Sequence, residues 1–406
     1  MSAPQRRGAA SHDPERKRRG AWYTPPSLVE AVVAEVLGSD PVRSGFRRAL
    51  DPACGDGRFV RATRLAEQTG VDIDPGVEPG DGVRFICADA LARDWGSELF
   101  DVVVGNPPFL SQMSSLTTRG GRSRFGGGAY ANAAAEFLAL AVRLTRPGGR
   151  VGMVLPQSLL ASRDAEGIRE FVDAHASLRW AWSTDANVFD ARVRVWAGVW
   201  EVGGARTEVR RALDLPMREV DPVAPPPSRS WAPLLTGVAV PDTAAGPRLG
   251  DIATFTANFR DQYYGLVGAV GDHDDGPPLV TSGLIDPRRC LWGDKPVTFA
   301  RQSYARPRVR LDSLSPAMRR WADVKLVPKI LIANQTRRVE AVVDERGEWL
   351  PSVPVITCVT SEPDRVMAVL ESERTEAWLR AHAAGTGLSA TALRLRPGLL
   401  ADVPLG

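Results

Sequence analysis

Short apolar runs alternate with stretches of helical periodicity between residues 49 and 202. The apolar runs predict strands at 49–54, 71–73, 83–88, 101–104, 150–155 and 193–202, and the periodic stretches predict helices at 58–67, 131–145 and 164–174. Strands that alternate with helices are typical of a mostly parallel, doubly wound α/β sheet of the Rossmann-like kind. Ligands of such sheets bind beyond the carboxyl ends of the strands, so we expect function in the loops that follow strands.

The pattern changes twice after residue 203. From 204 to 245 it fails, and Pro225-Pro226-Pro227 with scattered glycines predicts an irregular linker. Periodicity returns over 246–406, where strands at 329–333, 339–343 and 355–359 and a helix at 364–381 predict a mixed α+β domain. Because 406 residues exceed what one core usually supports, we expect a basic flexible N-terminus (1–20), an α/β domain (21–203), the linker and the C-terminal domain.

Positive charge is concentrated in two segments of a chain whose net charge is only +3. Residues 1–20 hold six Lys and Arg against two acids, and residues 301–338 hold ten against two. A concentrated basic segment on a nearly neutral protein is typical of a face that binds a polyanion, although an ordinary solvated surface has the same composition. We expect the aromatic residues Tyr263, Tyr264 and Phe259 of the same domain in the core.

Composition and cysteine spacing exclude several classes of protein. Hydrophobic residues make up 44% and charged residues 24%, which is ordinary for a soluble globular protein. No apolar run approaches the length of a membrane span, so we expect no membrane partner. Cys54, Cys87, Cys290 and Cys358 lack the spacing of a zinc site, which predicts no metal and the reduced thiols of a cytoplasmic protein.

A glycine-containing turn follows the first predicted strand, in the sequence Asp51-Pro52-Ala53-Cys54-Gly55-Asp56-Gly57. Gly55 and Gly57 allow the backbone to approach a ligand closely, and the helix that follows offers free N–H groups at its start. The turn is not a G-x-G-x-x-G motif, because Phe59 and Val60 occupy the region of the third glycine. A purely structural turn between strand and helix is the alternative.

Two further acidic residues stand at the ends of the next two predicted strands, Asp72 before Ile73, and Asp89. Asp72 is placed to accept hydrogen bonds from ribose hydroxyls, and Asp89 from an adenine amino group. Each acid alone is equally compatible with a helix cap or a turn. Three acids at successive strand ends, beginning with a glycine turn, predict a nucleoside pocket.

The most informative loop is Asn106-Pro107-Pro108-Phe109, which follows the apolar strand at 101–104. Two prolines fix φ and leave the Asn106 side chain and the Pro107 carbonyl as rigid acceptors. Two fixed acceptors match the two N–H donors of an exocyclic amino group, and Phe109 supplies a flat face for a base. This composition predicts a site for an amino group on a planar ring.

With these motifs the chain resembles the gamma-class adenine-N6 DNA methyltransferases, the TaqI-like group. Further similarity lies in the N-terminal segment Arg18-Arg19-Gly20-Ala21-Trp22-Tyr23-Thr24-Pro25-Pro26 and in Asn187-Val188-Phe189. The resemblance covers about residues 16–202 and extends loosely over 250–406. It implies S-adenosylmethionine as cofactor, a catalytic domain at 21–203, a target-recognition domain at 246–406, and direct methyl transfer to an adenine flipped out of double-stranded DNA.

The resemblance also implies roles for residues at matching positions. For catalysis these are Asn106, Pro107, Pro108, Phe109 and Phe189. For the cofactor they are Tyr23, Thr24, Pro25, Asp51, Pro52, Ala53, Gly55, Gly57, Asp72, Ile73, Asp89 and Asn106. For DNA we expect contacts from a loop at 111–128 and from the basic segment, through Arg119, Arg122, Arg124, Arg306, Arg308, Arg310, Lys329, Asn334, Gln335, Arg337 and Arg338. The alternative for this loop is an insertion that has no role.

Two other classes of function stay open. Asn-Pro-Pro-aromatic loops also serve methyltransferases that act on an RNA base or a protein glutamine. A non-catalytic accessory protein of a DNA-modification system would keep the same fold. The basic second domain favours DNA, and an enzyme of a restriction-modification or phage-defence system would have a cognate nuclease or defence subunits as candidate partners.

Overall fold

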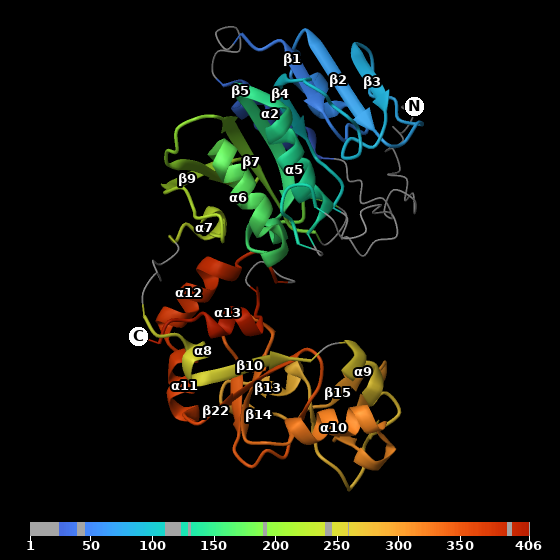
Figure 1. Cartoon of the computed structure of the whole chain (residues 1–406), viewed down its shortest axis with the longest axis vertical. Helices are drawn as coiled ribbons and strands as arrows, with labels where there is room; N and C mark the ends of the chain where they lie inside the picture. Colours follow the sequence, from blue (N-terminus) through green and yellow to red (C-terminus); the bar gives the residue numbers. More distant parts are fainter. Residues whose placement is uncertain are drawn as a thin grey trace, which may run out of the picture. The chain divides into compact units, whose positions relative to one another are not determined.

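The computed structural model describes residues 24–38, 45–109, 123–128, 131–189, 193–239, 246–258, 260–387 and 392–405. The chain forms two compact units, Met1–Arg229 and Ser230–Gly406. Figure 1 shows the first unit in blue to green and the second in yellow to red. In the part of the chain that is described, no helix combines the length and the apolar character needed to cross a lipid bilayer.

A mixed sheet forms the centre of the first unit, with nine strands among the described residues in the order β3-β2-β1-β4-β5-β7-β6-β8-β9 (Figure 1). The strands are β1 (Arg48–Asp51), β2 (Glu67–Asp72), β3 (Val83–Cys87), β4 (Phe100–Gly105), β5 (Thr145–Pro156), β6 (Ala176–Ser183), β7 (Val195–Val202), β8 (Val209–Leu213) and β9 (Arg218–Val223). The neighbours β3, β2, β1, β4 and β5 are parallel, whereas β7 is antiparallel to β5 and to β6. The unit therefore has the large, mostly parallel sheet that the sequence predicts.

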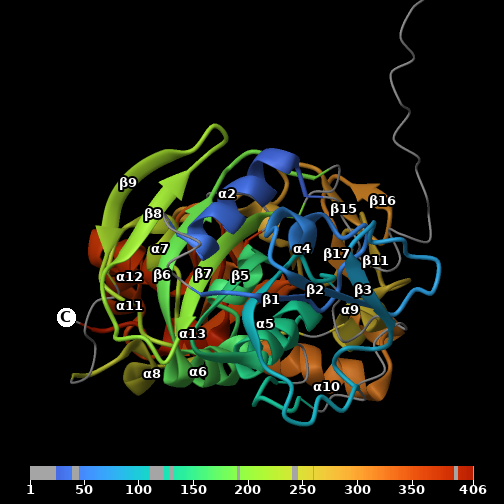
Figure 2. The ribbon, with the colours of Figure 1, turned by 90° about the horizontal axis from the view of Figure 1, so that it is seen from above.

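Helices cover both faces of this sheet, which explains why β4 is buried along its whole length. They are α2 (Pro26–Leu37), α4 (Arg58–Ala62), α5 (Ala133–Leu144) and α6 (Glu166–His175). In Figure 2, α2 and α4 lie on one side of the sheet and α5 and α6 on the other. Gly152 of β5 lets α2 approach closely, since a Cβ atom there would collide with Val36.

The stretch predicted as a linker is largely part of the first unit. The structure places β8 and β9 within 204–229, with β8 parallel to β6 and β9 antiparallel to β8. Val209 and Ala212 of β8 are buried and Arg210 between them is exposed, so the strand carries an apolar signal of only a few positions in a polar stretch. The structure corrects the predicted boundaries at 203 and 246 to a single division after Arg229.

An antiparallel sheet of β10, β22, β18 and β20 forms the centre of the second unit. Its strands are β10 (Ala253–Ala257), β18 (Lys329–Ala333), β20 (Ala341–Asp344) and β22 (Val355–Thr360). The side chains of Ile330, Ile332 and Ile356 pack against α11 (Pro363–Leu370), α12 (Glu373–Ala383) and α13 (Pro397–Ala401). Leu331, Val342 and Val355 contribute to a separate cluster of buried residues. The predicted helix at 364–381 is thus two helices, α11 and α12.

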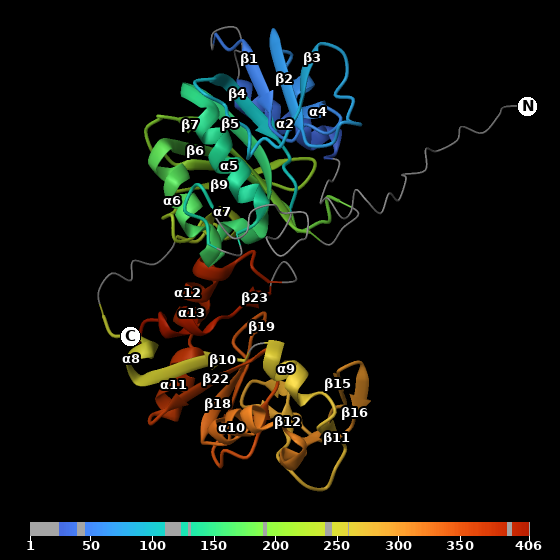
Figure 3. The same ribbon diagram turned by 45° about the vertical axis from the view of Figure 1, so that its right-hand side comes forward.

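A third cluster of buried residues joins α9 (Arg260–Leu266) and α10 (Pro316–Lys325) to the hairpin of β15 (Val297–Phe299) and β16 (Gln302–Tyr304). Figure 3 shows this hairpin at the edge of the second unit. The short remaining elements are α7 (Pro233–Thr236), α8 (Leu249–Ile252), β11 (Val270–Gly271), β12 (Leu279–Val280), β13 (Ile285–Asp286), β14 (Arg289–Cys290), β17 (Arg308–Val309), β19 (Gln335–Thr336), β21 (Leu350–Pro351) and β23 (Leu393–Arg394). Single 3₁₀ turns occupy Gln157–Leu160, Arg163–Ala165, Ser282–Leu284 and Leu311–Ser313.

Candidate active site

Four of the predicted site residues stand at one edge of the first unit's sheet. Asp51 ends β1, Asp72 ends β2, Asp89 follows β3, and Asn106 follows β4. These four strands are neighbours and run parallel, so their carboxyl ends meet at the same edge. The fold therefore brings together the loops that the sequence selected separately.

The glycine turn after β1 has the backbone conformation that requires glycine. Gly55 and Gly57 have φ of 48° and 73°. A Cβ atom on Gly57 would also collide with the carbonyl oxygen of Pro79. The Gly55 N–H donates to Asp72 Oδ2 at 3.0 Å, which ties the turn to the end of β2. The turn and the strand-end carboxylate thus form one rigid unit.

Asp51 is buried at 1% exposure beneath this turn. Its Oδ1 accepts a hydrogen bond from the Ala53 N–H at 3.1 Å. Burial raises the pKa of Asp51 to about 8, against the effect of the Ala53 hydrogen bond and with help from the negative charges of Asp72 and Asp56. A buried acid among other acids is a site that a cationic ligand would stabilise.

Asp72 and Ile73 lie together at the end of β2. Asp72 Oδ1 accepts from the Asp74 N–H at 3.0 Å, so its carboxylate is fixed by two backbone donors and retains lone pairs for further ones. The Ile73 side chain beside it is 63% exposed, which is unusual for a large aliphatic residue at a strand end. Asp89 instead accepts from the Leu91 N–H at 2.9 Å and so also supports a local turn.

The Asn106–Phe109 loop begins where β4 ends. Gly105 is needed at this point, because a Cβ atom there would lie 2.6 Å from Asp51 Oδ1. Pro107 is buried, and the Phe109 ring contacts the Phe189 ring with centroids 6.2 Å apart and planes inclined by 56°. The two rings thus contact each other in this structure, and a base would enter between them only if they separated.

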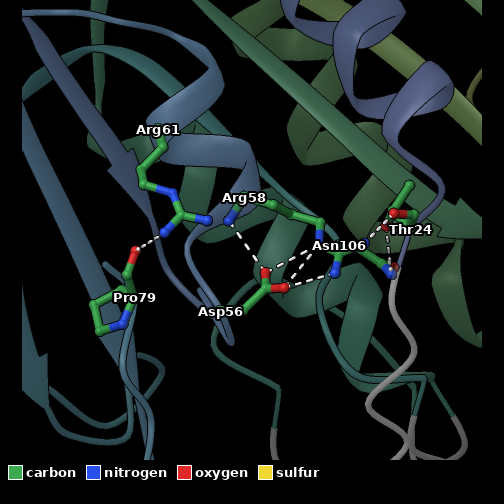
Figure 4. A network of polar contacts seen from close by, with 6 residues as sticks. All are labelled: Thr24, Asp56, Arg58, Arg61, Pro79 and Asn106. Carbon is green, nitrogen blue, oxygen red and sulfur yellow. Dashed lines mark hydrogen bonds and ion pairs between the residues drawn. The ribbon is translucent and has the colours of Figure 1, made fainter. Parts of the chain in front are cut away.

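A polar network joins this loop to the N-terminal segment and to the glycine turn (Figure 4). Asn106 Nδ2 donates to the hydroxyl oxygen of Thr24 at 3.0 Å. The Thr24 carbonyl accepts from Arg58 Nη1, and Arg58 Nη2 and Nε also bind the Asp56 carboxylate at 2.6 and 3.0 Å. Burial opposes the charge on Asp56, but its bonds to Arg58 hold the pKa of this carboxyl below its ordinary value.

Residues 82–189 match the model of the Eco57I restriction-modification methylase family. The matched range contains both Asn106 and Phe189. A Type II methyltransferase of Thermus thermophilus is 34% identical over 178 residues, which are 38% of this chain and 38% of that protein. The chain thus spans under two fifths of the length of this curated relative. Together the two matches support a methyltransferase of the restriction-modification type.

The fold also matches a solved structure over nearly the whole chain. The Type IIL restriction-modification enzyme MmeI, solved in complex with DNA, is 13% identical and has a TM-score of 0.57. The likeness covers 95% of this chain and 68% of the MmeI chain. Because the identity is so low, this match shows a shared fold for both units.

The predicted DNA-contacting residues differ in their surroundings. Arg306, Arg310, Arg337 and Arg338 are exposed in the second unit, as is Arg124 in the first. Arg308 is partly buried, with its guanidinium 4.8 Å from the centre of the Trp292 ring. Gln335 of β19 and the preceding Asn334 are partly buried. Tyr23, Arg119 and Arg122 lie outside the described residues.

The structure corrects the prediction for Lys329. Its side chain is 1% exposed and its Nζ lies 2.5 Å from Asp344 Oδ2, so the ammonium is paired inside the second unit. Lys329 is therefore not one of the exposed basic residues that could contact DNA. Tyr264, which we expected in the core, is in contrast 64% exposed.

Sequence reasoning missed Arg58, Asp56 and Gly105 as parts of the site. Arg58 and Asp56 flank Gly57, and alternating charges there are ordinary at the start of a helix. The need for glycine at position 105 becomes clear only from the structure, because it depends on the Asp51 carboxylate that lies against Gly105. These roles depend on contacts between residues far apart in the chain.

Proposed function

We propose that this chain is a site-specific DNA methyltransferase that transfers a methyl group from S-adenosylmethionine to N6 of an adenine flipped out of double-stranded DNA. The observation that carries the proposal is the position of Asn106-Pro107-Pro108-Phe109 at the end of β4, beside the strand-end acids of β1 and β2. The match of residues 82–189 to a restriction-modification methylase family supports the same reaction.

The residues at the strand ends fit S-adenosylmethionine. The left-handed glycines keep side chains away from the turn, Asp72 holds lone pairs for ribose hydroxyls, and the exposed Ile73 offers an apolar face to an adenine. The buried Asp51 carboxyl suits a cofactor that carries positive charge. Pro25, Pro52 and Ala53 belong to the same two segments and are further candidate contacts for the cofactor. Asp89 is the candidate acceptor for the adenine amino group.

The protein's task in this reaction is to orient the nucleophile, since S-adenosylmethionine supplies a methyl group already activated on a sulfonium. Asn106 Oδ1 and the Pro107 carbonyl would accept the two N–H bonds of adenine N6, which directs the nitrogen lone pair out of the ring plane. Transfer would form the bond between N6 and the methyl carbon as the C–S bond of the cofactor breaks. The sulfur would leave with the bonding electrons, and N6 would release its extra proton to solvent. Phe109 and Phe189 would hold the ring once the base separates them.

The second unit would supply most of the contacts to DNA. Arg306, Arg310, Arg337 and Arg338 are exposed and suit phosphate or base edges, and Arg124 of the first unit is a further candidate. We place the enzyme in a restriction-modification or phage-defence system, with a cognate nuclease or defence subunits as partners. Methylation of an RNA base or of a protein glutamine is the alternative substrate class.

The test is transfer of labelled methyl groups from S-adenosylmethionine to duplex DNA, with RNA and release factor as competing acceptors. We expect label on adenine N6 in DNA. Asn106→Ala should lower the transfer rate on the order of 10²-fold or more, with cofactor affinity much less affected.

The matched control for Asn106→Ala is Asn132→Ala. Asn132 is also an asparagine of the first unit, but its side chain caps the N-terminus of α5. Its loss should cost about 1 kcal/mol of stability and leave the transfer rate unchanged. Unchanged transfer in Asn106→Ala, or label in RNA or protein alone, contradicts the proposal.

A further inference from the structure

The hydroxyl of Thr24 faces the side chain on which the proposed reaction depends. Thr24 is 1% exposed and accepts the hydrogen bond from Asn106 Nδ2 at 3.0 Å. Because the amide is planar, directing Nδ2 toward Thr24 directs the acceptor Oδ1 to the other side of the group (Figure 4). This bond therefore sets both the rotation of the Asn106 amide and the direction of its acceptor atom.

A residue next to the glycine turn fixes the backbone of Thr24. Arg58 donates to the Thr24 carbonyl, and the Asp56 carboxylate holds the Arg58 guanidinium through two nitrogen atoms. A planar guanidinium bound in this way is fixed in position at the cost of little further entropy. The N-terminal segment, the glycine turn and the Asn106 loop are thus linked by one chain of hydrogen bonds.

We propose that Thr24 is a positioning residue for methyl transfer: its hydroxyl orients the Asn106 amide, and Arg58 fixes Thr24 in place. This inference rests on the proposed function and adds to it a side-chain role beyond cofactor contact. It links the cofactor turn to the substrate-binding amide. The side chain of Thr24 then contributes to the rate of transfer more than to cofactor affinity.

The experiment compares Thr24→Val with Thr24→Ser. Valine keeps the shape of threonine but cannot accept a hydrogen bond, so we expect the single-turnover transfer rate to fall about tenfold, the effect of one neutral hydrogen bond. The dissociation constant for S-adenosylmethionine, measured by calorimetry, should stay within about threefold. Serine should restore most of the rate, since it restores the hydroxyl.

The control is Thr63→Val, a change at another buried threonine, which follows the last residue of α4 and whose hydroxyl donates to the Val60 carbonyl. It should lower the melting temperature and leave the transfer rate unchanged. Arg58→Met should reduce the rate as Thr24→Val does, and the double variant should lose less than the two losses combined. An unchanged rate in Thr24→Val, or an equal loss of cofactor affinity and rate, contradicts the inference. A wild-type protein that methylates nothing contradicts the proposed function instead.

A separate observation concerns the turn of the β15–β16 hairpin. Phe299 pairs with Gln302, so Ala300 and Arg301 form a two-residue turn, with φ of 48° and 65°. Left-handed φ at both positions is the conformation for which hairpins prefer Asn-Gly, and it is strained for alanine and arginine. Contacts with Tyr263 stabilise this strained turn. The Ala300 N–H donates to the Tyr263 hydroxyl at 3.1 Å, and the centroids of the Tyr263 and Phe299 rings are 4.8 Å apart.

This supported turn presents Arg301 to solvent. Arg301 is exposed and forms no ion pair or side-chain hydrogen bond with any described residue, whereas Arg288 and Arg319 are paired with Glu371 and Asp323. The exposed Tyr264 ring stands edge-on to Tyr263 at 5.5 Å. Figure 3 shows the β15–β16 hairpin at the edge of the second unit. An exposed arginine at the turn of a β-hairpin is suited to contact with nucleic acid.

We infer that the β15–β16 turn enters a groove of the DNA, where Arg301 reads a guanine edge. A two-stranded ribbon fits the major groove, and arginine binds guanine O6 and N7 with two hydrogen bonds. The strained backbone is then the consequence of selecting arginine at a position that glycine would fit better. This inference also rests on the proposed function, and it names the element that determines sequence specificity.

The variant Arg301→Gly distinguishes the effect of the turn on protein stability from its effect on DNA recognition. Glycine at φ of 65° relieves the strain, so the melting temperature should be equal to or higher than that of the wild type. The same change should lower the affinity for the DNA recognition sequence about tenfold and relax the sequence specificity at one base position. Ala300→Asn, which relieves strain and keeps Arg301, should gain stability with wild-type affinity and specificity. Wild-type affinity and specificity in Arg301→Gly contradict the inference, while absence of methylation by the wild type contradicts the proposed function.

Discussion

The carboxyl group of Asp51 lies where the glycine turn and the Asn106 loop meet, buried at 1% exposure and against Gly105. The sequence identified Asp51 as a strand-end acid, because the turn that follows it has a clear composition. Its burial, and hence its altered pKa, could not be predicted, since both depend on residues of three other segments. The same is true of the Thr24 hydroxyl, whose partner Asn106 is 82 residues away.

Asp51→Asn should change stability in a pH-dependent way. In the unfolded chain this carboxyl ionises near pH 4, whereas in the folded protein its pKa is about 8. Between these values the folded protein keeps a proton that the unfolded chain has lost, so wild-type stability falls as pH rises, by at most about 1.4 kcal/mol per pH unit. Urea unfolding without cofactor should therefore favour Asp51→Asn more at pH 8 than at pH 5.

Asp56→Asn is the matched comparison at this site. The pKa of Asp56 lies below its ordinary value, so its stabilising bond to Arg58 is fully formed above about pH 5. The deficit of Asp56→Asn should consequently change much less between pH 5 and pH 8, because the charge of Asp56 is the smallest of the contributions that raise the pKa of Asp51. A pH-independent difference for Asp51→Asn would contradict the burial of an uncharged carboxyl at this position.

At the scale of elements, strands with strong apolar runs were predicted within a few residues, as β4, β7 and β18 show. The strand β5 begins at Thr145, five residues before the predicted start. The sequence did not reveal α2 or β6, and it treated β8 and β9 as linker. Arg64 has a left-handed φ of 53°, so α4 ends at Ala62 instead of continuing to 67 as predicted. Short elements of this kind are selected by packing against the sheet more than by their own composition.

The pairing of β18 with β20 explains why Lys329 is not a surface cation. Lys329 is buried opposite Asp344, whose carboxylate also accepts from the backbone N–H groups of Glu348 and Trp349. Lys329→Met leaves this buried carboxylate without its cation, and we expect it to lower the free energy of unfolding by about 3 kcal/mol. DNA affinity of the folded variant should be unchanged, measured by fluorescence anisotropy. A loss of affinity without a loss of stability would restore Lys329 as a DNA contact.

At the scale of the whole molecule, positive charge is concentrated in one segment of the second unit. Residues 301–338 carry ten basic residues against two acids, although the whole chain has a net charge of only +3. The structure divides this segment into paired arginines, a buried lysine and exposed arginines such as Arg337 and Arg338. The sequence thus located the basic segment, but only the fold separates its surface charges from its structural ones.

Salt dependence measures how many of these charges contact phosphate. Each contact that is removed should reduce the slope of log affinity against log salt concentration by about one. We therefore expect Arg337→Ala with Arg338→Ala to reduce the slope by about two. Arg288→Ala, which removes an arginine already bound to Glu371, should leave it nearly unchanged. Equal slopes in the wild type and the double variant would exclude these two arginines from the DNA-binding surface.

The central claim is tested most directly by expressing the chain in a host that lacks adenine methylation and sequencing the genomic DNA for modified bases. We predict N6-methyladenine in one defined sequence context, and no modification in cells that express Asn106→Ala at the same level. Unmodified DNA from cells that contain the folded, cofactor-binding wild-type protein would contradict the claim that the chain alone methylates adenine in DNA.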